Sequence, residues 1–360
     1  MLLCTVVLLE IKGSHNYNPK RAQAALAIPL NVISKKWAEF EAGGRQQQQN
    51  FGMPSGRKHD RANAGPKIAI IIPYRDRAVH LSAFEDHMHK FATSQFPGAQ
   101  LTLWIVEQGN DQVFTRGWLG NIGIREVVKV QPDTQCLVFH DVDMVPLPGV
   151  PYLECNRPIQ LGSELENHQR DDGNWSVPYL RFTGGIVSMS PQHWMQTNGF
   201  SNEYIGWGQE DDDLYHRLRM NGLLNEKNCP SRPEPGNGKF ALIDEGGDNH
   251  PRRHGPSSPK KNVNKQLLFL AWGDRARPTD TWKNTHYWKH DGISNIAYTV
   301  VARKTQKAVP GNSLTRHTIT VVPDPSFPLP GTRLGYKVEE SNYTTAKPSC
   351  KGHLWRGVGP

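Results

Sequence analysis

The sequence of this chain predicts an α/β fold with a largely parallel central sheet. Residues 67–73, 101–106 and 136–139 are continuous apolar runs, which are typical of strands buried on both faces. Apolar residues at spacings of three and four over residues 81–91 predict an amphipathic helix between the first two strands. A strand, a helix and a second strand in this order favour parallel pairing, because a helical crossover brings the chain back in the same direction.

Three later segments carry weaker signals. Residues 212–221 begin with acids and end before Gly222, which predicts a helix. Residues 230–265 are rich in Gly, Pro and basic side chains, which predicts a long mobile loop of the kind that often serves function. Beyond residue 302 the chain is polar and rich in turn-forming residues, so we expect a peripheral tail there.

The 360 residues suffice for one large domain or two smaller ones. We expect an apolar N-terminus with a flexible basic stem over residues 1–65, a folded body over residues 66–302 and a peripheral tail over residues 303–360. The first nine residues are too few to cross a bilayer, which needs about 20, and they lack the basic flank of a secretory signal. A truncated membrane anchor, an atypical signal and a plain apolar end stay open.

The positive charge of the chain lies mostly outside the folded body. There are 42 Lys and Arg against 34 Asp and Glu, a net charge of +8 with neutral His. Residues 1–65 hold nine basic and four acidic side chains and therefore contribute +5 of this charge. A nucleic-acid reader concentrates basic residues in its folded body. The sequence therefore argues against nucleic-acid binding.

Two carboxylates follow the third apolar run directly, in Asp141-Val142-Asp143. The period of two in an extended segment puts both on one face, and ligands of α/β sheets bind beyond the carboxyl ends of strands. Hard oxygen ligands in this position suit Mg²⁺ or Mn²⁺ bridging a diphosphate. A solvated turn is the alternative interpretation.

Four consecutive acids follow Trp207 in the segment Trp207–Asp213. Crowded carboxylates repel one another, which raises the pKa of at least one of them and makes it a useful general base. Trp207 lies between two glycines and offers an aromatic face for a sugar ring. An acid-rich helix start on the surface is the alternative.

Basic residues gather in two further places. His250 and His254 flank a proline and two arginines, and imidazole suits Mn²⁺ or Zn²⁺ while arginine suits phosphate. Arg75 and Arg77 follow the first strand, where they could bind a nucleotide phosphate or pair with surface acids. A solvent-exposed basic loop is the alternative for the histidine segment.

Taken together and in order, these motifs resemble the β-1,4-galactosyltransferases, glycosyltransferase family 7. The resemblance covers roughly residues 67–300, and its motifs are Pro73-Tyr74-Arg75-Asp76-Arg77, Phe114-Thr115-Arg116, Asp141-Val142-Asp143-Met144-Val145-Pro146, Gly184-Gly185, Gly206-Trp207-Gly208-Gln209-Glu210-Asp211-Asp212-Asp213 and Asp291-Gly292-Ile293-Ser294-Asn295. It implies a GT-A-type, Rossmann-like nucleotide-sugar transferase domain that is Mn²⁺-dependent and inverting. It also implies a UDP-sugar donor and a glycan or glycoconjugate acceptor.

The resemblance also implies roles for individual residues. Asp211 would be the general base, Trp207, Glu210 and Asp212 would contact the acceptor sugar, and Asp143 with His254 would bind the metal. The residues expected to line the donor site are Pro73, Arg75, Arg77, Phe114, Arg116, Asp141, Val142, Phe182, Gly184 and Gly185. The two glycines would let the backbone approach the donor closely.

Some positions depart from the family pattern. Pro251 replaces a ligating methionine, which makes His250 the substitute second metal ligand. Phe182 replaces a tyrosine that helps to select galactose over N-acetylgalactosamine, so a UDP-GalNAc donor is an alternative. The acceptor, N-acetylglucosamine or xylose, stays open. A non-catalytic sugar-binding relative is the alternative from another class.

The resemblance further implies a disulfide between Cys136 and Cys155, and hence an oxidising lumen. Cys4, Cys229 and Cys350 are then left without an assigned pairing. Sequons at Asn174 and Asn342 fit the same route. We therefore expect a protein of the Golgi lumen or secretory pathway, with a type II membrane anchor as an open alternative.

Overall fold

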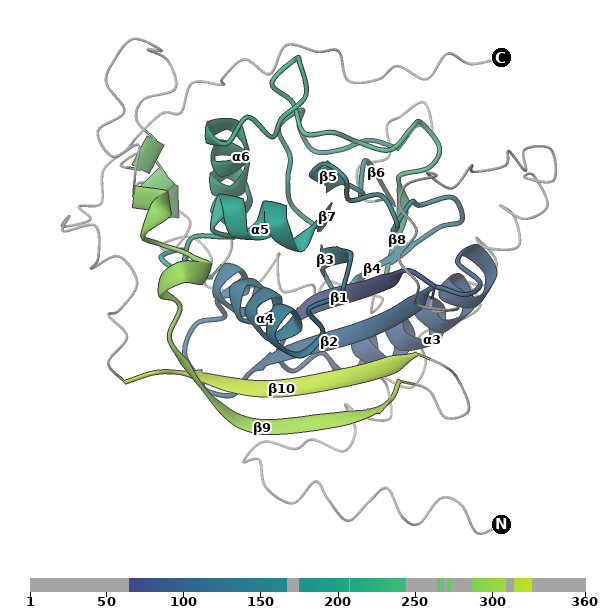
Figure 1. Cartoon of the computed structure of the whole chain (residues 1–360), viewed down its shortest axis with the longest axis horizontal. Coiled ribbons are helices and arrows are strands. Elements are labelled where there is room, and N and C mark those ends of the chain that lie inside the picture. Colours follow the sequence, from purple (N-terminus) through teal and green to yellow (C-terminus); the bar gives the residue numbers. More distant parts are fainter. Residues whose placement is uncertain are drawn as a thin grey trace.

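The computed structural model describes residues 65–166, 175–206, 208–243, 287–308 and 314–325, together with the shorter pieces 264–265, 267–268 and 271–272. Its centre is a seven-stranded sheet in the order β5-β7-β3-β1-β2-β10-β9 (Figure 1). The strands of this sheet are β1 (Lys67–Tyr74), β2 (Gln100–Gln108), β3 (Cys136–His140), β5 (Ile159–Gln160), β7 (Ile186–Met189), β9 (Tyr298–Lys307) and β10 (Thr315–Pro323). The remaining elements are α3 (Ala78–Gln95), α4 (Arg116–Val130), β4 (Met144–Pro146), β6 (Glu164–Leu165), α5 (Pro191–Thr197), α6 (Glu210–Met220), β8 (Lys239–Leu242) and two short 3₁₀ helices, η3 (Tyr287–Lys289) and η4 (Ile293–Asn295).

The expected fold class is confirmed. The four neighbouring strands β3, β1, β2 and β10 run parallel, and the antiparallel strands β7 and β9 flank them on the two sides. Beyond β7, β5 pairs antiparallel with β7 and so runs in the direction of the central strands. A small second sheet, in the order β4-β8-β6, lies beside them. The three predicted strands correspond to β1, β2 and β3, and the helix predicted over residues 81–91 corresponds to α3.

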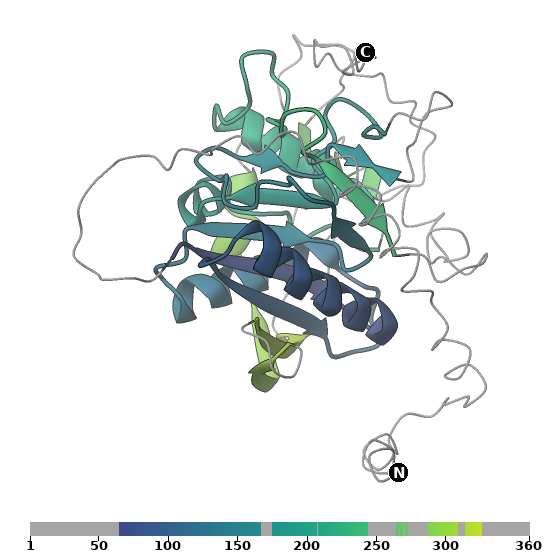
Figure 2. The same cartoon turned by 90° about the vertical axis from the view of Figure 1, so that its right-hand side faces the viewer.

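Helices α3 and α4 cover opposite faces of the sheet. In β1, Ile70 packs in the same core cluster as Phe84 of α3, whereas its neighbour Ile71 packs in a second cluster with Leu119 of α4. This alternation is the two-residue period of a strand, and it explains why the strand is apolar at every position. In Figure 2, α3 lies in front of the sheet, and the β9–β10 hairpin projects below it.

Helix α4 was not predicted from periodicity, because glycines interrupt the apolar residues of its buried face. A Cβ on Gly120 would lie 2.5 Å from the ring of Phe139, and one on Gly123 would lie 2.3 Å from Ile71. The glycines therefore let the helix backbone approach the sheet closely. They also interrupt the apolar pattern that would have marked the helix in the sequence.

Two predictions about the later chain were wrong. The boundary expected at residue 302 falls inside β9, and β10 pairs with β2 in the body of the sheet. Both strands lack a continuous apolar run because most of their side chains are partly or fully exposed. The loop expected over residues 230–265 contains strand β8. Residues 1–64, 244–263 and 326–360 lie outside the described residues, so the remaining domain limits stay predictions.

The topology brings the two expected donor motifs together. Strand β1 lies between β3 and β2, so the chain passes from β1 to β2 on one side and then crosses back to β3 on the other side. Such a reversal of strand order is the switch point at which α/β sheets bind ligands. The segments that follow β1 and β3 leave the sheet at adjacent parallel ends.

Among the described residues, none of the helices is long and apolar enough to cross a membrane.

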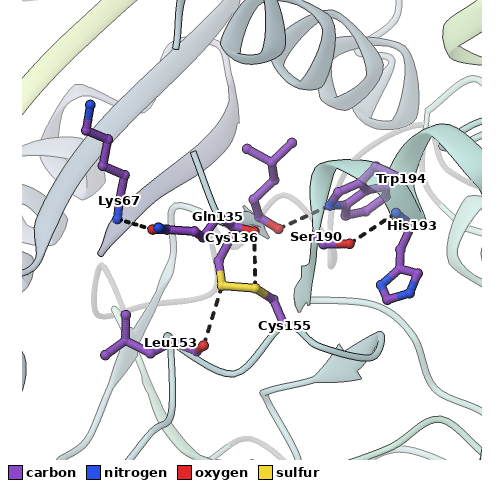
Figure 3. Close-up of a disulfide and its surroundings, with 9 residues drawn as sticks. Lys67, Gln135, Cys136, Leu153, Cys155, Ser190, His193 and Trp194 are labelled. Atoms are coloured by element: carbon purple, nitrogen blue, oxygen red, sulfur yellow. Dashed lines mark hydrogen bonds between the residues drawn. A yellow bond between two sulfur atoms is a disulfide. The ribbon is translucent and has the colours of Figure 1, made fainter. Parts of the chain in front are cut away.

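The expected disulfide between Cys136 and Cys155 is present (Figure 3). Cys136 opens β3, and Cys155 lies 19 residues later. The closed loop therefore contains the whole aspartate motif. Cys229, for which the sequence suggested no partner, is disulfide-bonded as well.

Replacing Cys136 and Cys155 together by serine is expected to lower the free energy of unfolding by about 3 kcal/mol, because a cross-link of this loop length restricts the unfolded chain. Urea unfolding of the double variant against the wild type measures this. A loss below about 1 kcal/mol would show that the loop is held by its packing instead.

Candidate active site at the ends of β1 and β3

Arg116, the first residue of α4, joins motifs that lie far apart in the sequence. Its Nε lies 2.7 Å from Asp141 Oδ1, and its Nη1 lies 3.2 Å from Glu210 Oε1. Its Nη2 donates to the carbonyl of Gly185 at 3.3 Å, and the guanidinium stacks 4.3 Å from the ring centroid of Phe139. Three of the residues predicted for the site, Asp141, Glu210 and Gly185, are thus held around the Arg116 cation.

This cation offsets the burial of two acids. Burial by itself would lower the pKa of Arg116, but the carboxylates of Asp141 and Glu210 raise it overall, so the guanidinium stays charged. Burial raises the pKa of Glu210, and Arg116 reduces that increase. Within the described part of the chain, the buried Oε2 of Glu210 has no hydrogen-bond partner. It is therefore a free acceptor beside the site.

Asp211 has the electrostatic character of a general base. Its pKa is raised well above the usual range, first by burial and then by the carboxylates of Glu210 and Asp212. The hydroxyl of Tyr179 donates to Asp211 Oδ2 at 3.4 Å, and the backbone N–H of Asp212 donates to Oδ1 at 2.9 Å. Asp211 itself is only partly covered. Its carboxyl is therefore receptive to a proton.

The fourth acid of the motif points into the core. Asp213 accepts from Arg217 Nε at 2.5 Å, from the indole N–H of Trp272 at 2.6 Å and from the hydroxyl of Tyr287. Because successive helix residues differ by about 100° in direction, four consecutive acids cannot share one face. Asp213 therefore anchors the helix that carries Glu210, Asp211 and Asp212, whose roles in the site stay predictions.

The glycine pair at 184–185 is required by packing against α6. A Cβ on Gly184 would lie 2.7 Å from Asp211 Oδ2 and 2.7 Å from the ring of Phe182, and Gly185 has φ +71°. The ring of Phe182 contacts that of Tyr179 edge-on, with the centroids 5.6 Å apart. The role of the glycines in donor approach stays a prediction.

Sequence reasoning missed two residues of this region, Tyr179 and Arg232. Arg232 donates to the carbonyls of Leu180 at 2.9 Å and Phe182 at 3.2 Å, and burial lowers its pKa to about 10. Only the proximity of Tyr179 to Phe182 in the sequence could have drawn attention to the first. Arg232 lies 50 residues from the backbone that it holds, and no local signal marks it.

The residues after β1 form the other wall. Pro73 is buried near the end of β1. Arg75, just after the strand, donates to the carbonyls of Asn110 and Gln112. The guanidinium of Arg75 also lies 5.5 Å from the ring centroid of Phe114.

Arg77 and Val142 complete this wall. Arg77 Nη2 lies 3.5 Å from Asp143 Oδ2, and its Nε donates to His80 Nδ1 at 3.2 Å. Val142 is buried in the core between the two aspartates. The predicted donor residues thus converge on the ends of β1 and β3.

The donor atoms near Asp143 fit a divalent metal such as Mn²⁺. The N–H of Ile243 donates to the Asp143 carbonyl at 2.7 Å, so the chain that carries His250 and His254 leaves β8 beside this carboxylate. A carboxylate with imidazole is a suitable donor set for Mn²⁺. His250, His254 and Trp207 lie outside the described residues, and within those residues no group of three or more His, Cys, Asp or Glu could hold a metal.

Comparison with known proteins identifies the family. A model of the N-terminal region of glycosyl transferase group 7 matches residues 20–156, and a model of the N-terminal domain of galactosyltransferase matches residues 167–234. The chain belongs to glycosyltransferase family 7. The expected resemblance is therefore confirmed.

Individual relatives agree with this assignment. The mouse β-1,4-galactosyltransferase 1 is 31% identical over 277 residues, which cover 77% of this chain and 58% of that protein. The β-1,4-galactosyltransferase 4 of Cricetulus griseus is 30% identical over 258 residues, which cover 71% and 65%. The chain thus spans about three fifths of the length of the curated relatives it matches.

Solved structures also match the fold. A Drosophila β-1,4-galactosyltransferase 7 variant, crystallised with manganese, UDP-Gal and xylobiose, superposes with a TM-score of 0.54 at 25% identity. The match covers 72% of this chain and 94% of that one. The catalytic domain of the same enzyme with xylobiose gives a TM-score of 0.53. The family 7 chain therefore has the expected GT-A-type fold.

Replacing Asp211 by Asn is expected to stabilise the protein at pH 7, because the amide carries no charge that burial and the neighbouring carboxylates disfavour. The folded state raises the pKa of Asp211, so the unfolded chain loses this proton first and stability falls as pH rises above about 4. The gain should therefore vanish near pH 4 in urea titrations.

Asp213→Asn is the matched control, two residues further along the same helix. It breaks a fully buried ion pair with Arg217, so we expect a loss of about 3–5 kcal/mol. A loss of stability in Asp211→Asn at pH 7 would contradict the assigned electrostatics.

Proposed function

We propose that this chain is an inverting, Mn²⁺-dependent β-1,4-galactosyltransferase that moves galactose from UDP-galactose to a hydroxyl of N-acetylglucosamine or xylose. The observation that carries the proposal is the position of Asp211, a carboxyl with a raised pKa, next to Glu210, which Arg116 links to Asp141. The family membership and the UDP-Gal and manganese in the Drosophila structure support the same chemistry.

The donor would lie across the ends of β1 and β3. Arg75 and Arg77 flank this edge of the sheet and would contact the nucleotide diphosphate, together with the backbone near Asp141. Asp143, with His254 and His250, would hold Mn²⁺. When bound, the metal would supply positive charge that stabilises the departing diphosphate.

The acceptor would lie over the start of α6. Trp207 would stack on its ring, and Glu210 Oε2 and Asp212 would accept hydrogen bonds from its hydroxyls. Asp211 would take the proton of the attacking hydroxyl as the oxygen bonds to the anomeric carbon and the bond from that carbon to the diphosphate breaks. Attack from the face opposite the leaving group inverts the configuration.

One residue of the site favours a second candidate for the donor sugar. Phe182 presents a ring without a hydroxyl beside Gly184 and Asp211. A missing hydroxyl removes one means of discrimination between sugars. UDP-GalNAc is therefore the second candidate donor.

The disulfide of Cys136 with Cys155 supports synthesis in an oxidising compartment. We propose the Golgi lumen or secretory pathway, where glycoconjugates would be the acceptors. An N-terminal type II membrane anchor belongs to the same proposal.

The test is transfer by the purified chain. UDP-galactose and UDP-N-acetylgalactosamine are each offered to N-acetylglucosamine and xylose acceptors, with Mn²⁺ and with chelator. Metal-dependent product from one pair identifies both sugars. Binding of sugar by folded protein, without product or donor hydrolysis in any mixture, would favour a non-catalytic sugar-binding protein.

Asp211→Asn is expected to reduce kcat by about 10²–10⁴ with little change in donor KM, because general bases contribute about that much. In the wild type, kcat/KM should fall as pH drops below the raised pKa of Asp211, since the base is then protonated. Asp212→Asn is the companion variant and should mainly raise acceptor KM. An equal loss of donor binding and turnover in Asp211→Asn would remove Asp211 as the base.

Asp143→Ala is expected to abolish Mn²⁺-dependent transfer, because it removes the one metal ligand that lies in the described residues. Asp133→Ala is the control, since Asp133 forms an exposed pair with Lys67 at the start of β1, remote from the site. Mn²⁺ titration of the initial rate measures both. Unchanged metal dependence in Asp143→Ala would exclude its assignment.

A further inference from the structure

A buried histidine beneath the aspartate motif has no part in the chemistry proposed above. His140 is the last residue of β3 and is completely buried, with the rings of Phe84 and Phe240 against it. Its Nδ1 lies 2.8 Å from the carbonyl oxygen of Asp141, and its Nε2 lies 2.7 Å from the hydroxyl of Tyr152. Both ring nitrogens are therefore engaged by polar groups of one short stretch of chain.

The chemistry of these partners determines the direction of both hydrogen bonds. A carbonyl oxygen only accepts, so Nδ1 must carry the proton that it donates to Asp141. Burial lowers the pKa of His140 to about 4, so the ring is neutral and Nε2 has a lone pair. Tyr152 must then donate to Nε2. The hydrogen bonds run in one direction, from Tyr152 through His140 to the Asp141 carbonyl.

The hydrogen bonds of the Asp141 carbonyl fix the backbone conformation of the turn that carries both site aspartates. Within the turn, the N–H of Met144 reaches the same oxygen only at 3.4 Å, so the histidine provides the shorter hydrogen bond. The two carboxylates of the turn diverge, Asp141 to Arg116 and Asp143 to Arg77. A rotation of the Asp141–Val142 peptide would redirect both of them.

Tyr152 is itself held from two sides. Its ring packs against those of Phe91 and Phe96, with centroids 5.3 and 6.4 Å away. It lies three residues before Cys155, which the disulfide ties to Cys136 at the start of β3. The disulfide therefore closes a loop in which Tyr152 meets His140 across the aspartate turn.

We propose that Tyr152 and His140 are positioning residues that hold the Asp141–Asp143 turn in the geometry required to bind a divalent cation at Asp143. The inference rests on the proposed metal role of Asp143. It concerns two residues that contact neither metal nor substrate. Outer partners of metal ligands typically alter metal affinity by about 10–100-fold when removed.

The experiment measures binding of Mn²⁺ alone to the full chain, without donor or acceptor, by electron paramagnetic resonance of the free ion. Tyr152→Phe should raise the Mn²⁺ Kd about tenfold, whereas kcat at saturating metal and donor should stay near the wild-type value. Tyr298→Phe is the matched control. It also removes a tyrosine hydroxyl hydrogen bond, to Glu126 at 2.5 Å, but on β9 at the far edge of the sheet.

A second pair of variants keeps the test valid if Tyr152→Phe is too unstable to assay. His140→Gln retains an N–H donor for the Asp141 carbonyl, and His140→Leu removes it. We expect Gln to recover Mn²⁺ affinity at least fivefold relative to Leu, in samples shown to be folded by circular dichroism. A loss of packing alone would not separate these two variants in this way.

The outcomes are distinct. Mn²⁺ affinity within twofold of the wild type in Tyr152→Phe, or an equal loss in Tyr298→Phe, would overturn the positioning role. Equal Mn²⁺ affinity of His140→Gln and His140→Leu would overturn it as well. Asp143→Ala is measured in parallel: if it alone loses Mn²⁺, the proposed metal site stands and the positioning role fails. If it binds Mn²⁺ as the wild type does, the proposed metal site itself fails.

Discussion

The ion pairs of Arg116 are the interaction on which the site depends. Its guanidinium lies against Asp141 from one motif and Glu210 from another, and it binds the backbone of Gly185 from a third. Without this cation, two largely buried carboxylates would face each other uncompensated, and breaking such buried pairs typically costs about 3–5 kcal/mol. The donor and acceptor sides of the site are thus stabilised by the same charge.

Arg116 can occupy this position because α4 lies unusually close to the sheet. Gly120 packs directly on the ring of Phe139, and the guanidinium of Arg116 stacks on that same ring. Larger residues at the helix glycines would push α4 away from β3. The geometry of the charged site therefore rests on close backbone packing one and two helical turns away.

The acid-rich start of α6 combines acids whose charged forms are destabilised by burial with one acid, Asp213, that forms a stabilising buried ion pair. Burial raises the pKa of Glu210 and Asp211, and the neighbouring carboxylates raise both further. Asp213 offsets this on the inner face, where it meets Arg217, Trp272 and Tyr287. Such a division is expected where a functional site stores unfavourable electrostatics, because the remaining structure must hold the charges in place.

The sequence by itself determined the elements whose signals are local. The apolar runs of β1, β2 and β3, the period of α3 and the order of the site motifs were all readable along the chain, and the family resemblance located the disulfide. The tertiary structure was needed to find α4, whose buried face mixes glycines with apolar side chains, and β9 and β10, whose side chains are largely exposed. It also decided the pairing of Arg116 with Glu210, 94 residues away, and the inward direction of Asp213. The physical reason is that hydrophobic periodicity reports burial within one element, whereas ion pairs, close glycine packing and edge-strand pairing depend on which elements meet in space.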